Sequence, residues 1–365
     1  MIRKKDSNFS IIFKILILFI SISVLQSGEK YYYTGKDYGN EYLYNPLYVI
    51  LNGSFDIIQF ESNSRKIFEL PYGIGSANLL KNLGKPFKSI NEYGTWNFIS
   101  NEVFPLTFRK EGMQWWPNYG MHLIGGGMTF ASLEEWYDYH NFPQPYLFSA
   151  VTTMFYHYWN EVVEMEDYQG WTVDPIADLY IFDIASIVLF SFDDVKKFFR
   201  EELNLADWSL QPSITIPSWE LQNNGQYFSV RWYLPFYNKL ALFGYYGLNG
   251  LGGVSYKTSD DESISLGLGT RGASRYIIDT NASSRQYTLN LTWNAGLFWD
   301  RNNSLLASVL FSGQENNLCN INIYPGAIDL GDIKIGFWAV IPRNGDYYFG
   351  ISTRYIPGIG VSNND

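Results

Sequence analysis

The stretch Tyr287–Trp299, YTLNLTWNAGLFW, alternates apolar and polar residues along its whole length. This period-two pattern predicts a β-strand with one apolar face and one polar face. The polar positions carry small, uncharged side chains: Thr288, Asn290, Thr292 and Asn294. The same texture continues over residues 209–357, with turn residues about every ten positions, which predicts an antiparallel module of about ten strands.

The composition of the two faces indicates which kind of β module this is. A soluble sandwich points apolar side chains inward and charged ones outward. Here the polar positions are mainly Ser, Thr, Asn, Gly and Tyr, and Tyr and Trp lie near strand ends, as in the aromatic girdles of membrane barrels. We therefore expect a membrane β-barrel over residues 209–357, followed by a short tail over 358–365. A soluble sandwich or a lipocalin-like barrel is the alternative.

Residues 28–208 are predicted to form a helical domain, so the expected fold class is α+β, a helical N-terminal half followed by an antiparallel membrane β-barrel. The clearest helix is Pro145–Met165, which is apolar nearly all round. Five polar residues share one seam of it at helical spacing: Ser149, Thr153, Tyr156, Asn160 and Glu164. The Tyr-rich residues 28–44 are expected to be a loosely docked lead-in.

Residues 1–27 have the pattern of a bacterial signal peptide. Basic residues precede the apolar core Ile15–Leu25, and Ser27 offers a small residue for cleavage. The apolar stretch is short for a membrane span, and an uncleaved anchor helix is the alternative. We expect a bacterial cell-envelope protein in the outer membrane, with membrane lipid as its partner and envelope protein partners left open.

Net charge and cysteine content exclude several classes of function. The net charge of −10 disfavours binding to a nucleic-acid backbone. Cys319 is the only cysteine, which excludes an intramolecular disulfide and a cysteine-based zinc site. The sequence contains no glycine-rich phosphate loop and no H-E-x-x-H motif, so no cofactor is predicted.

One group of ionisable residues lies in the apolar helices: His122, Glu161, Glu164, Asp174 and Asp178. Buried charges must be paired, hydrated or protonated, so the simplest interpretation is a structural polar cluster. A second interpretation is a divalent metal site built from one imidazole and several carboxylates, although the Glu-x-x-His pairs of di-iron bundles are absent. A third is acid/base catalysis, with a carboxylate orienting His122 and Ser149 as nucleophile.

The chain resembles an uncharacterised family of bacterial outer-membrane proteins in which a helical region leads into a C-terminal barrel. The likeness rests on Asn118 with His122 and the glycines after it, on Ser149, on Tyr158–Glu164 and on Asp174–Asp178. It implies an outer-membrane location and this two-part fold, and it implies no activity. The expected function is an integral outer-membrane protein of structural, lipid-interacting or transport type, with a helical plug or periplasmic region. A lipid- or acyl-modifying enzyme that uses the His/carboxylate cluster is the alternative.

Overall fold

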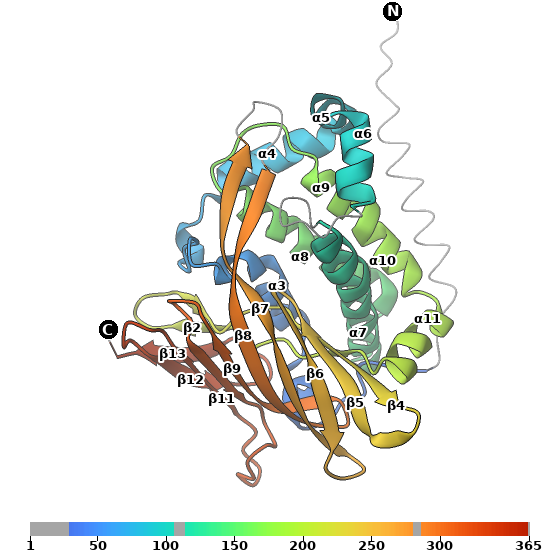
Figure 1. The fold of residues 1–365 in the computed structure, drawn as a ribbon, viewed down its shortest axis with the longest axis vertical. Helices are drawn as coiled ribbons and strands as arrows, with labels where there is room; N and C mark the ends of the chain where they lie inside the picture. The colour runs from blue at the N-terminus through green and yellow to red at the C-terminus, as the bar shows by residue number, and fades with distance from the viewer. Residues whose placement is uncertain (1–28, 106–113, 280–285, 364–365) are drawn as a thin grey trace, which may run out of the picture.

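The computed structural model describes residues 29–105, 114–279 and 286–363, and the predicted signal peptide lies outside this part of the chain. A helical half is followed by one large sheet, as Figure 1 shows from blue to red. Within the described residues, one bent pair of helical segments, Asp174–Leu189 and Asp193–Glu202 at 87°, has the length and hydropathy of a membrane span, and no single helix does.

The helical half contains α-helices together with short 3₁₀-helices (η1, η2) and π-helices (η3 to η6). They are α2 Gly39–Leu43, α3 Pro46–Ser54, η1 Asp56–Gln59, η2 Ile67–Glu69, α4 Tyr72–Gly84, α5 Pro86–Tyr93, α6 Thr95–Asn97, η3 Phe98–Val103, η4 Trp116–Gly125, α7 Gly126–Tyr139, α8 Pro145–Met165, α9 Asp174–Ala177, η5 Asp178–Phe182, α10 Asp183–Leu189, α11 Asp193–Lys197 and η6 Phe198–Glu202. Helix α8 spans the predicted range, with Pro145 at its first position, where a missing N–H costs nothing.

The sheet has thirteen strands in the order β1-β4-β5-β6-β7-β8-β9-β10-β11-β12-β13-β2-β3. They are β1 Ala206–Asp207, β2 Ser213–Thr215, β3 Leu221–Gln222, β4 Phe228–Leu234, β5 Tyr237–Tyr246, β6 Asn249–Lys257, β7 Glu262–Asp279, β8 Gln286–Arg301, β9 Ser304–Ser312, β10 Cys319–Ile323, β11 Gly336–Ile341, β12 Tyr348–Ser352 and β13 Gly358–Ser362. Strands β4 to β13 form an antiparallel meander, and only the β13–β2 pair is parallel.

A helical N-terminal half followed by a mostly antiparallel sheet is confirmed, but the sheet is not a closed barrel. Its two edges in the described residues are β1 and β3, which do not pair with each other. The predicted tail contains β13, and β1 begins within the range predicted to be helical. These two strands escaped prediction because β1 is too short to show alternation, and because β13 alternates Ile359 and Val361 with glycines that resemble a turn.

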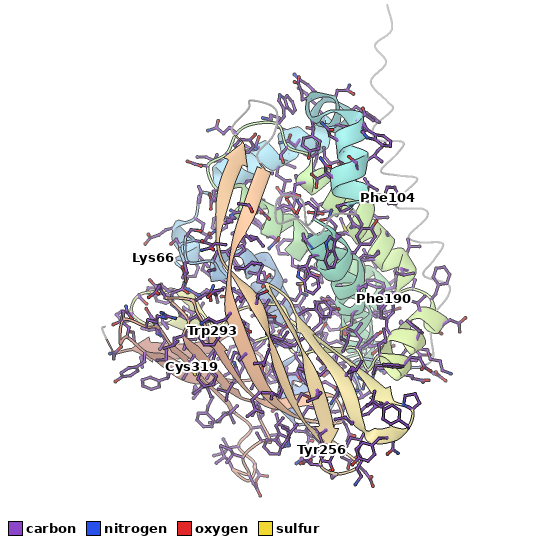
Figure 2. The ribbon with its side chains drawn as sticks, viewed as in Figure 1. Lys66, Phe104, Phe190, Tyr256, Trp293 and Cys319 are labelled. Carbon is purple, nitrogen blue, oxygen red and sulfur yellow. The ribbon has the colours of Figure 1, made fainter. Side chains whose placement is uncertain are left out.

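The exposed face of the sheet differs from that of a soluble sandwich, and the buried face carries polar side chains beside an aromatic core. Large apolar side chains are exposed on one face: Trp232, Leu242, Val254, Tyr256, Ile264, Leu266, Leu268, Trp293, Leu297, Phe311, Ile341, Phe349, Ile351, Ile359 and Val361. We call these residues the outer face; Figure 2 labels Tyr256 and Trp293 among them. Polar side chains are buried on the other, inner face: Ser229, Arg231, Asn249, Ser255, Ser263, Ser265, Asn294, Ser304, Ser308, Asn320, Asn322 and Ser352.

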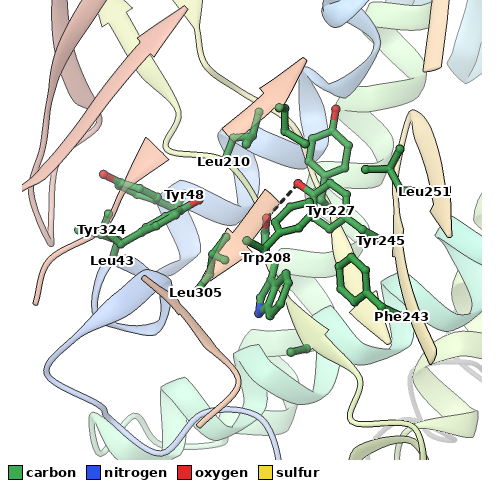
Figure 3. Close-up of a cluster of buried hydrophobic side chains, with 13 residues drawn as sticks. Leu43, Tyr48, Trp208, Leu210, Tyr227, Phe243, Tyr245, Leu251, Leu305 and Tyr324 are labelled. Atoms are coloured by element: carbon green, nitrogen blue, oxygen red, sulfur yellow. Dashed lines mark hydrogen bonds between the residues drawn. The ribbon is translucent and has the colours of Figure 1, made fainter. Parts of the chain in front are cut away.

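The inner face is covered by α2, α3, η1 and the segment that leads from the helices into β4. Aromatic rings from this segment and from the sheet pack into one core around Trp208, Tyr227 and Tyr245 (Figure 3). On α3, Asn52 donates to the carbonyl of Leu210 and accepts from the N–H of Gly225, both at 2.9 Å. These early helices therefore fill the concave side of the sheet.

One ion pair is enclosed within the polar interior of the sheet. The Arg231 guanidinium donates to both carboxylate oxygens of Asp300, at 2.7 and 3.1 Å, and both side chains are almost completely buried. The guanidinium also lies over the ring of Trp208, 5.4 Å from its centroid. Both charges thus have their partner inside the fold.

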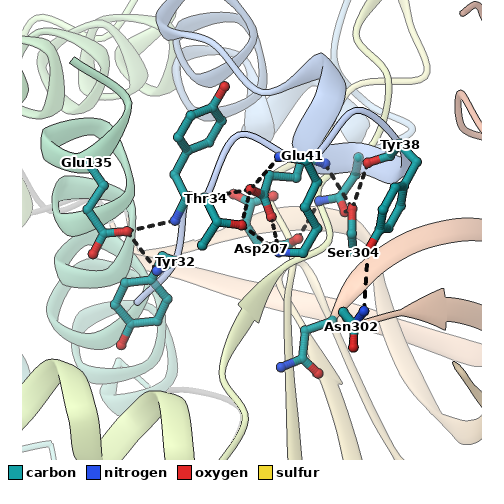
Figure 4. A network of polar contacts seen from close by, with 12 residues as sticks. Tyr32, Thr34, Tyr38, Glu41, Glu135, Asp207, Asn302 and Ser304 are labelled. Atoms are coloured by element: carbon teal, nitrogen blue, oxygen red, sulfur yellow. Dashed lines mark hydrogen bonds and ion pairs between the residues drawn. The ribbon is translucent and has the colours of Figure 1, made fainter. Parts of the chain in front are cut away.

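The lead-in is docked firmly instead of loosely. The backbone N–H groups of Tyr31, Tyr32 and Tyr33 all donate to the Glu135 carboxylate of α7, at 2.7–2.8 Å (Figure 4 shows Glu135 beside Tyr32). The three tyrosine side chains are buried. The prediction was wrong because a polar, Tyr-rich composition does not reveal a carboxylate about a hundred residues later that collects its N–H groups.

Three consecutive glycines let the start of α7 approach three other elements closely. A Cβ at Gly125 would lie 2.4 Å from the Phe228 ring of β4, and one at Gly127 would lie 2.2 Å from the ring of Phe190. At Gly126 the nearest atom is in the His157 ring of α8, at 3.1 Å. Any other residue at the two outer positions would force its neighbour to move.

Candidate functional site

A cavity of about 670 Å³ lies between the helical half and strands β6 to β8. Its wall combines Trp116, His122 and Asp178 of the helices with Arg275 and Leu291 of the sheet. A cavity of this size is in the range of small-molecule binding sites. The ionisable side chains at one end of it form a tight cluster.

The core of the cluster is Asp183, the first residue of α10, which is held between two imidazoles. Its Oδ1 lies 2.9 Å from Nδ1 of His122 and also contacts Nδ1 of His157. The two rings meet edge to face, with centroids 4.8 Å apart. Asp183 therefore fixes the orientation of both rings and leaves Nε2 of His122 free of this carboxylate.

Two further carboxylates, Glu161 and Asp178, complete the cluster. Nε2 of His122 lies 3.6 Å from Oδ2 of Asp178. Single donor atoms of His122, Glu161 and Asp178 all lie within 4.8 Å of one another, and the same holds for His122, His157 and Asp183. His122 and Asp178 lie on the π-helices η4 and η5, a rare conformation that is frequent at functional sites.

Several oxygen atoms of the cluster have no hydrogen-bond partner. In the part of the chain that the structure describes, the buried carboxylate oxygens without a partner are Oε2 of Glu161, Oδ1 of Asp178 and Oδ2 of Asp183. All three residues are less than 5% exposed: 1% for Glu161, 4% for Asp178 and 0% for Asp183. Leaving such acceptors unsatisfied costs about 1–3 kcal/mol each.

The electrostatics keep most of the cluster uncharged. Burial raises the pKa of Glu161 and of Asp178 well above the usual range of a carboxyl, and neighbouring carboxylates add to this effect. Burial opposes ionisation of Asp183 as well, but the two imidazoles outweigh it and lower its pKa. Burial lowers the pKa of His157, whereas Asp183 overcomes burial at His122 and raises its pKa. Burial thus favours the neutral form of Glu161 and Asp178, whereas the imidazoles favour the anionic form of Asp183.

The predicted residues Glu164 and Asp174 line the same cavity but have other partners. Glu164 accepts from Arg275 of β7 at 2.6 Å, which ties α8 to the sheet. Asp174 accepts from the Gln114 amide at 3.2 Å, and burial raises its pKa to about 7. Glu102, which was not predicted, lies on the far side of Gln114, and burial raises its pKa to about 8.

Ser149 is not part of the cluster, so the predicted serine–histidine arrangement is wrong. Its hydroxyl is buried and donates to the carbonyl of Phe130 at 2.5 Å. It precedes Glu161 by twelve positions on the straight run of α8, which separates them by about 18 Å at 1.5 Å per residue. Ser149 therefore joins α8 to α7, and it does not face His122.

The sequence predicted His122, Glu161 and Asp178 as site residues, but not His157 and Asp183. His157 shares a helix face with Glu161 at a spacing of four, a pattern that also arises by chance. Asp183 follows Asp178 by five positions, which an α-helix would place about 140° apart at 100° per residue. The N–H of Asp183 donates to the carbonyl of Asp178, a π-helical hydrogen bond that places these two residues on the same side of the helix. No sequence pattern predicted this bond.

No family model, curated protein or solved structure matches this chain. The resemblance to an outer-membrane family stays a prediction.

Proposed function

We propose that this chain is an integral protein of the bacterial outer membrane, with the outer face of its sheet in contact with lipid. The observation that carries the proposal is the apolar outer face of the sheet, whose large side chains are exposed where a soluble protein would carry charged ones. In water this arrangement would expose apolar surface far beyond the patches of ordinary soluble proteins. An apolar face toward lipid and small polar side chains on the opposite face are the pattern of transmembrane β-barrel strands.

Strand β7 illustrates the pattern most simply. Ile264, Leu266 and Leu268 point outward and are 46–65% exposed, whereas Ser263 and Ser265 between them are buried. The outer face also includes Trp232, Tyr256 and Trp293, residue types that favour the membrane–water interface. A soluble sandwich would carry charged side chains on this exposed face.

The helical half carries a smaller apolar surface of the same kind. On α8 the residues Leu147, Val151 and Phe155, one turn apart, are 43–59% exposed, while Thr153 and Tyr156 of the predicted polar seam are buried. The seam thus faces protein and the apolar stripe faces outward. This supports a role in contact with lipid for the helices as well as for the sheet.

The test combines fractionation with a charge placed on the outer face. The full chain should sediment with outer membranes and require detergent for extraction. In lipid vesicles, Leu266→Arg should lower the free energy of unfolding by about 2–4 kcal/mol, because a charge on a lipid-facing strand must be dehydrated. The matched control, Asp260→Arg in the exposed β6–β7 turn, should change it by less than about 0.5 kcal/mol.

Two outcomes would reject the proposal. One is recovery of the protein in the aqueous fraction without detergent. The other is a Leu266→Arg protein as stable in vesicles as the unsubstituted chain, since an outer face in water or against a polar partner would accept arginine.

A further inference from the structure

We propose that His122, Glu161 and Asp178 bind one divalent transition-metal ion, with Asp183 as the residue that positions His122. This goes beyond the proposed membrane role and does not depend on it. Nε2 of His122, one oxygen of Glu161 and one oxygen of Asp178 are the assigned ligands.

The distances fit such an ion. Zinc binds imidazole nitrogen and carboxylate oxygen at about 2.0–2.2 Å, so two ligand atoms around a tetrahedral ion lie about 3.4 Å apart. Nε2 of His122 and Oδ2 of Asp178 are 3.6 Å apart, too far for a good hydrogen bond and close to this value. The Glu161 donor atom lies within 4.8 Å of both, so a small rotation of its side chain completes the set.

The orphaned oxygens give independent support. Oε2 of Glu161 and Oδ1 of Asp178 are buried without any hydrogen-bond partner in the described chain, and both carboxylates belong to the group of ligand atoms around His122. Elsewhere in the described chain, the buried atoms without partners belong to amides, hydroxyls and ring or guanidinium nitrogens, and none is a carboxylate oxygen. A cation between these carboxylates and the imidazole would satisfy the acceptors that the fold itself leaves unsatisfied.

Asp183 has the role that a second carboxylate plays behind a metal-bound histidine. Its Oδ1 takes the Nδ1 side of His122, which fixes the tautomer and directs Nε2 toward Asp178. The other candidate set, His122, His157 and Asp183, is less suitable because Oδ1 of Asp183 is already hydrogen-bonded to Nδ1 of His122. His157 therefore supports Asp183 and does not bind the ion.

The ligand set indicates the class of metal. One imidazole and two carboxylates suit Zn²⁺ or Mn²⁺, whereas Ca²⁺ requires six to eight oxygen ligands. Three protein ligands leave coordination positions open, the arrangement of catalytic rather than structural zinc sites. His122 and Asp178 line the large cavity, so an open position would face a space that can admit a small molecule.

Calorimetry tests the ligand assignment directly. The full chain, without a histidine tag and stripped by chelator in detergent, is titrated with Zn²⁺ and separately with Mn²⁺. We expect one ion per chain for at least one of them, affinity at least tenfold weaker in Glu161→Gln and in Asp178→Asn, and no binding in His122→Gln. Asp183→Asn should weaken binding 10- to 100-fold. His157→Gln should weaken it less than threefold, and the matched control Glu134→Gln, a half-buried carboxylate on α7, should not change it.

A second measurement uses the unsubstituted chain and so does not depend on how the variants fold. Pulsed electron paramagnetic resonance of the Cu²⁺-loaded protein should detect one coordinated imidazole. Two imidazoles would overturn the assignment in favour of His122, His157 and Asp183. Failure of the folded chain to bind Zn²⁺ or Mn²⁺, or unchanged affinity in folded Glu161→Gln and Asp178→Asn proteins, would overturn the site altogether.

Discussion

The inner face of the sheet and the helical cluster both bury charged groups, yet they satisfy them differently. In the sheet, Arg231 and Asp300 meet in a two-bond ion pair that is closed to solvent. In the cluster, Glu161, Asp178 and Asp183 each keep one buried oxygen without a partner. The two carboxylate oxygens of Asp300 thus have their partners within the fold, whereas three carboxylates of the cluster each keep an oxygen that only a ligand would satisfy. Substitutions in each region test this comparison, together with one at Glu135, the carboxylate of α7 that binds the lead-in.

The largest effect is expected from Arg231→Met. The substitution leaves Asp300 buried without its cation, and breaking such a pair costs about 3–5 kcal/mol. Denaturant unfolding of the variant in detergent or lipid measures the loss. The double variant Arg231→Met/Asp300→Leu removes both charges and should recover most of it. If the single variant loses less than about 1 kcal/mol, the pair is not closed and the contrast with the cluster disappears.

Glu135 should give the next largest effect, and the size of that effect depends on pH. It is buried, and burial outweighs the N–H groups of Tyr31, Tyr33 and Tyr32 and raises its pKa to about 7, from a usual 4.5. The folded state therefore holds a proton that the unfolded state releases between pH 4.5 and 7. The contribution of Glu135 to stability falls as pH rises through this window and is constant above it.

The variant Glu135→Gln resembles the protonated acid and removes this dependence. It should match the unsubstituted protein near pH 4.5 and exceed its stability by about 3 kcal/mol above pH 7, at 1.36 kcal/mol per pKa unit. Urea unfolding of both proteins across this range measures the difference. A variant that is less stable at every pH would show instead that the three N–H donors require an ionised carboxylate.

The smallest effect is expected at the cluster. Glu161→Gln in the metal-free protein should change the free energy of unfolding by less than about 1 kcal/mol, because Oε2 has no hydrogen bond to lose. Denaturant unfolding in the presence of chelator measures it. A loss comparable with that of Arg231→Met would mean that Glu161 already has its partners, and that the cluster is as closed as the sheet.

The sequence predicted those parts of the molecule whose pattern is long and regular. Helix α8 was placed at its observed bounds because an apolar, proline-started run of this length has one periodicity. The alternation predicted the exposed apolar positions of β7 and of β8 at Trp293 and Leu297, because neighbouring side chains point to opposite sides. It was wrong for Leu289 and Leu291, which line the cavity. His122, Glu161 and Asp178 were recognised because charges in apolar helices require an explanation.

The remaining features depend on contacts that no local pattern encodes. Ser149 lies on the polar seam of α8 but at its other end, and a shared helix face does not report distance along the helix. Asp183 joins the site through a π-helical turn, which changes the register after Asp178. Closure of the sheet depends on whether its edges β1 and β3 meet, and these strands are only two residues long.

The run Gly125–Gly127 has a consequence for how the molecule can vary. Each glycine lies against an aromatic or imidazole ring from a different part of the fold: Phe228, His157 and Phe190. The run therefore sets how closely this helix approaches all three neighbours. A methyl group added at either end would wedge the helix away from its neighbour, and because the central glycine abuts the histidine beside Asp183, the displacement would carry into the cluster. A substitution in this triplet is therefore expected to disturb two things together: the packing of the helices on the sheet and the geometry of the cluster.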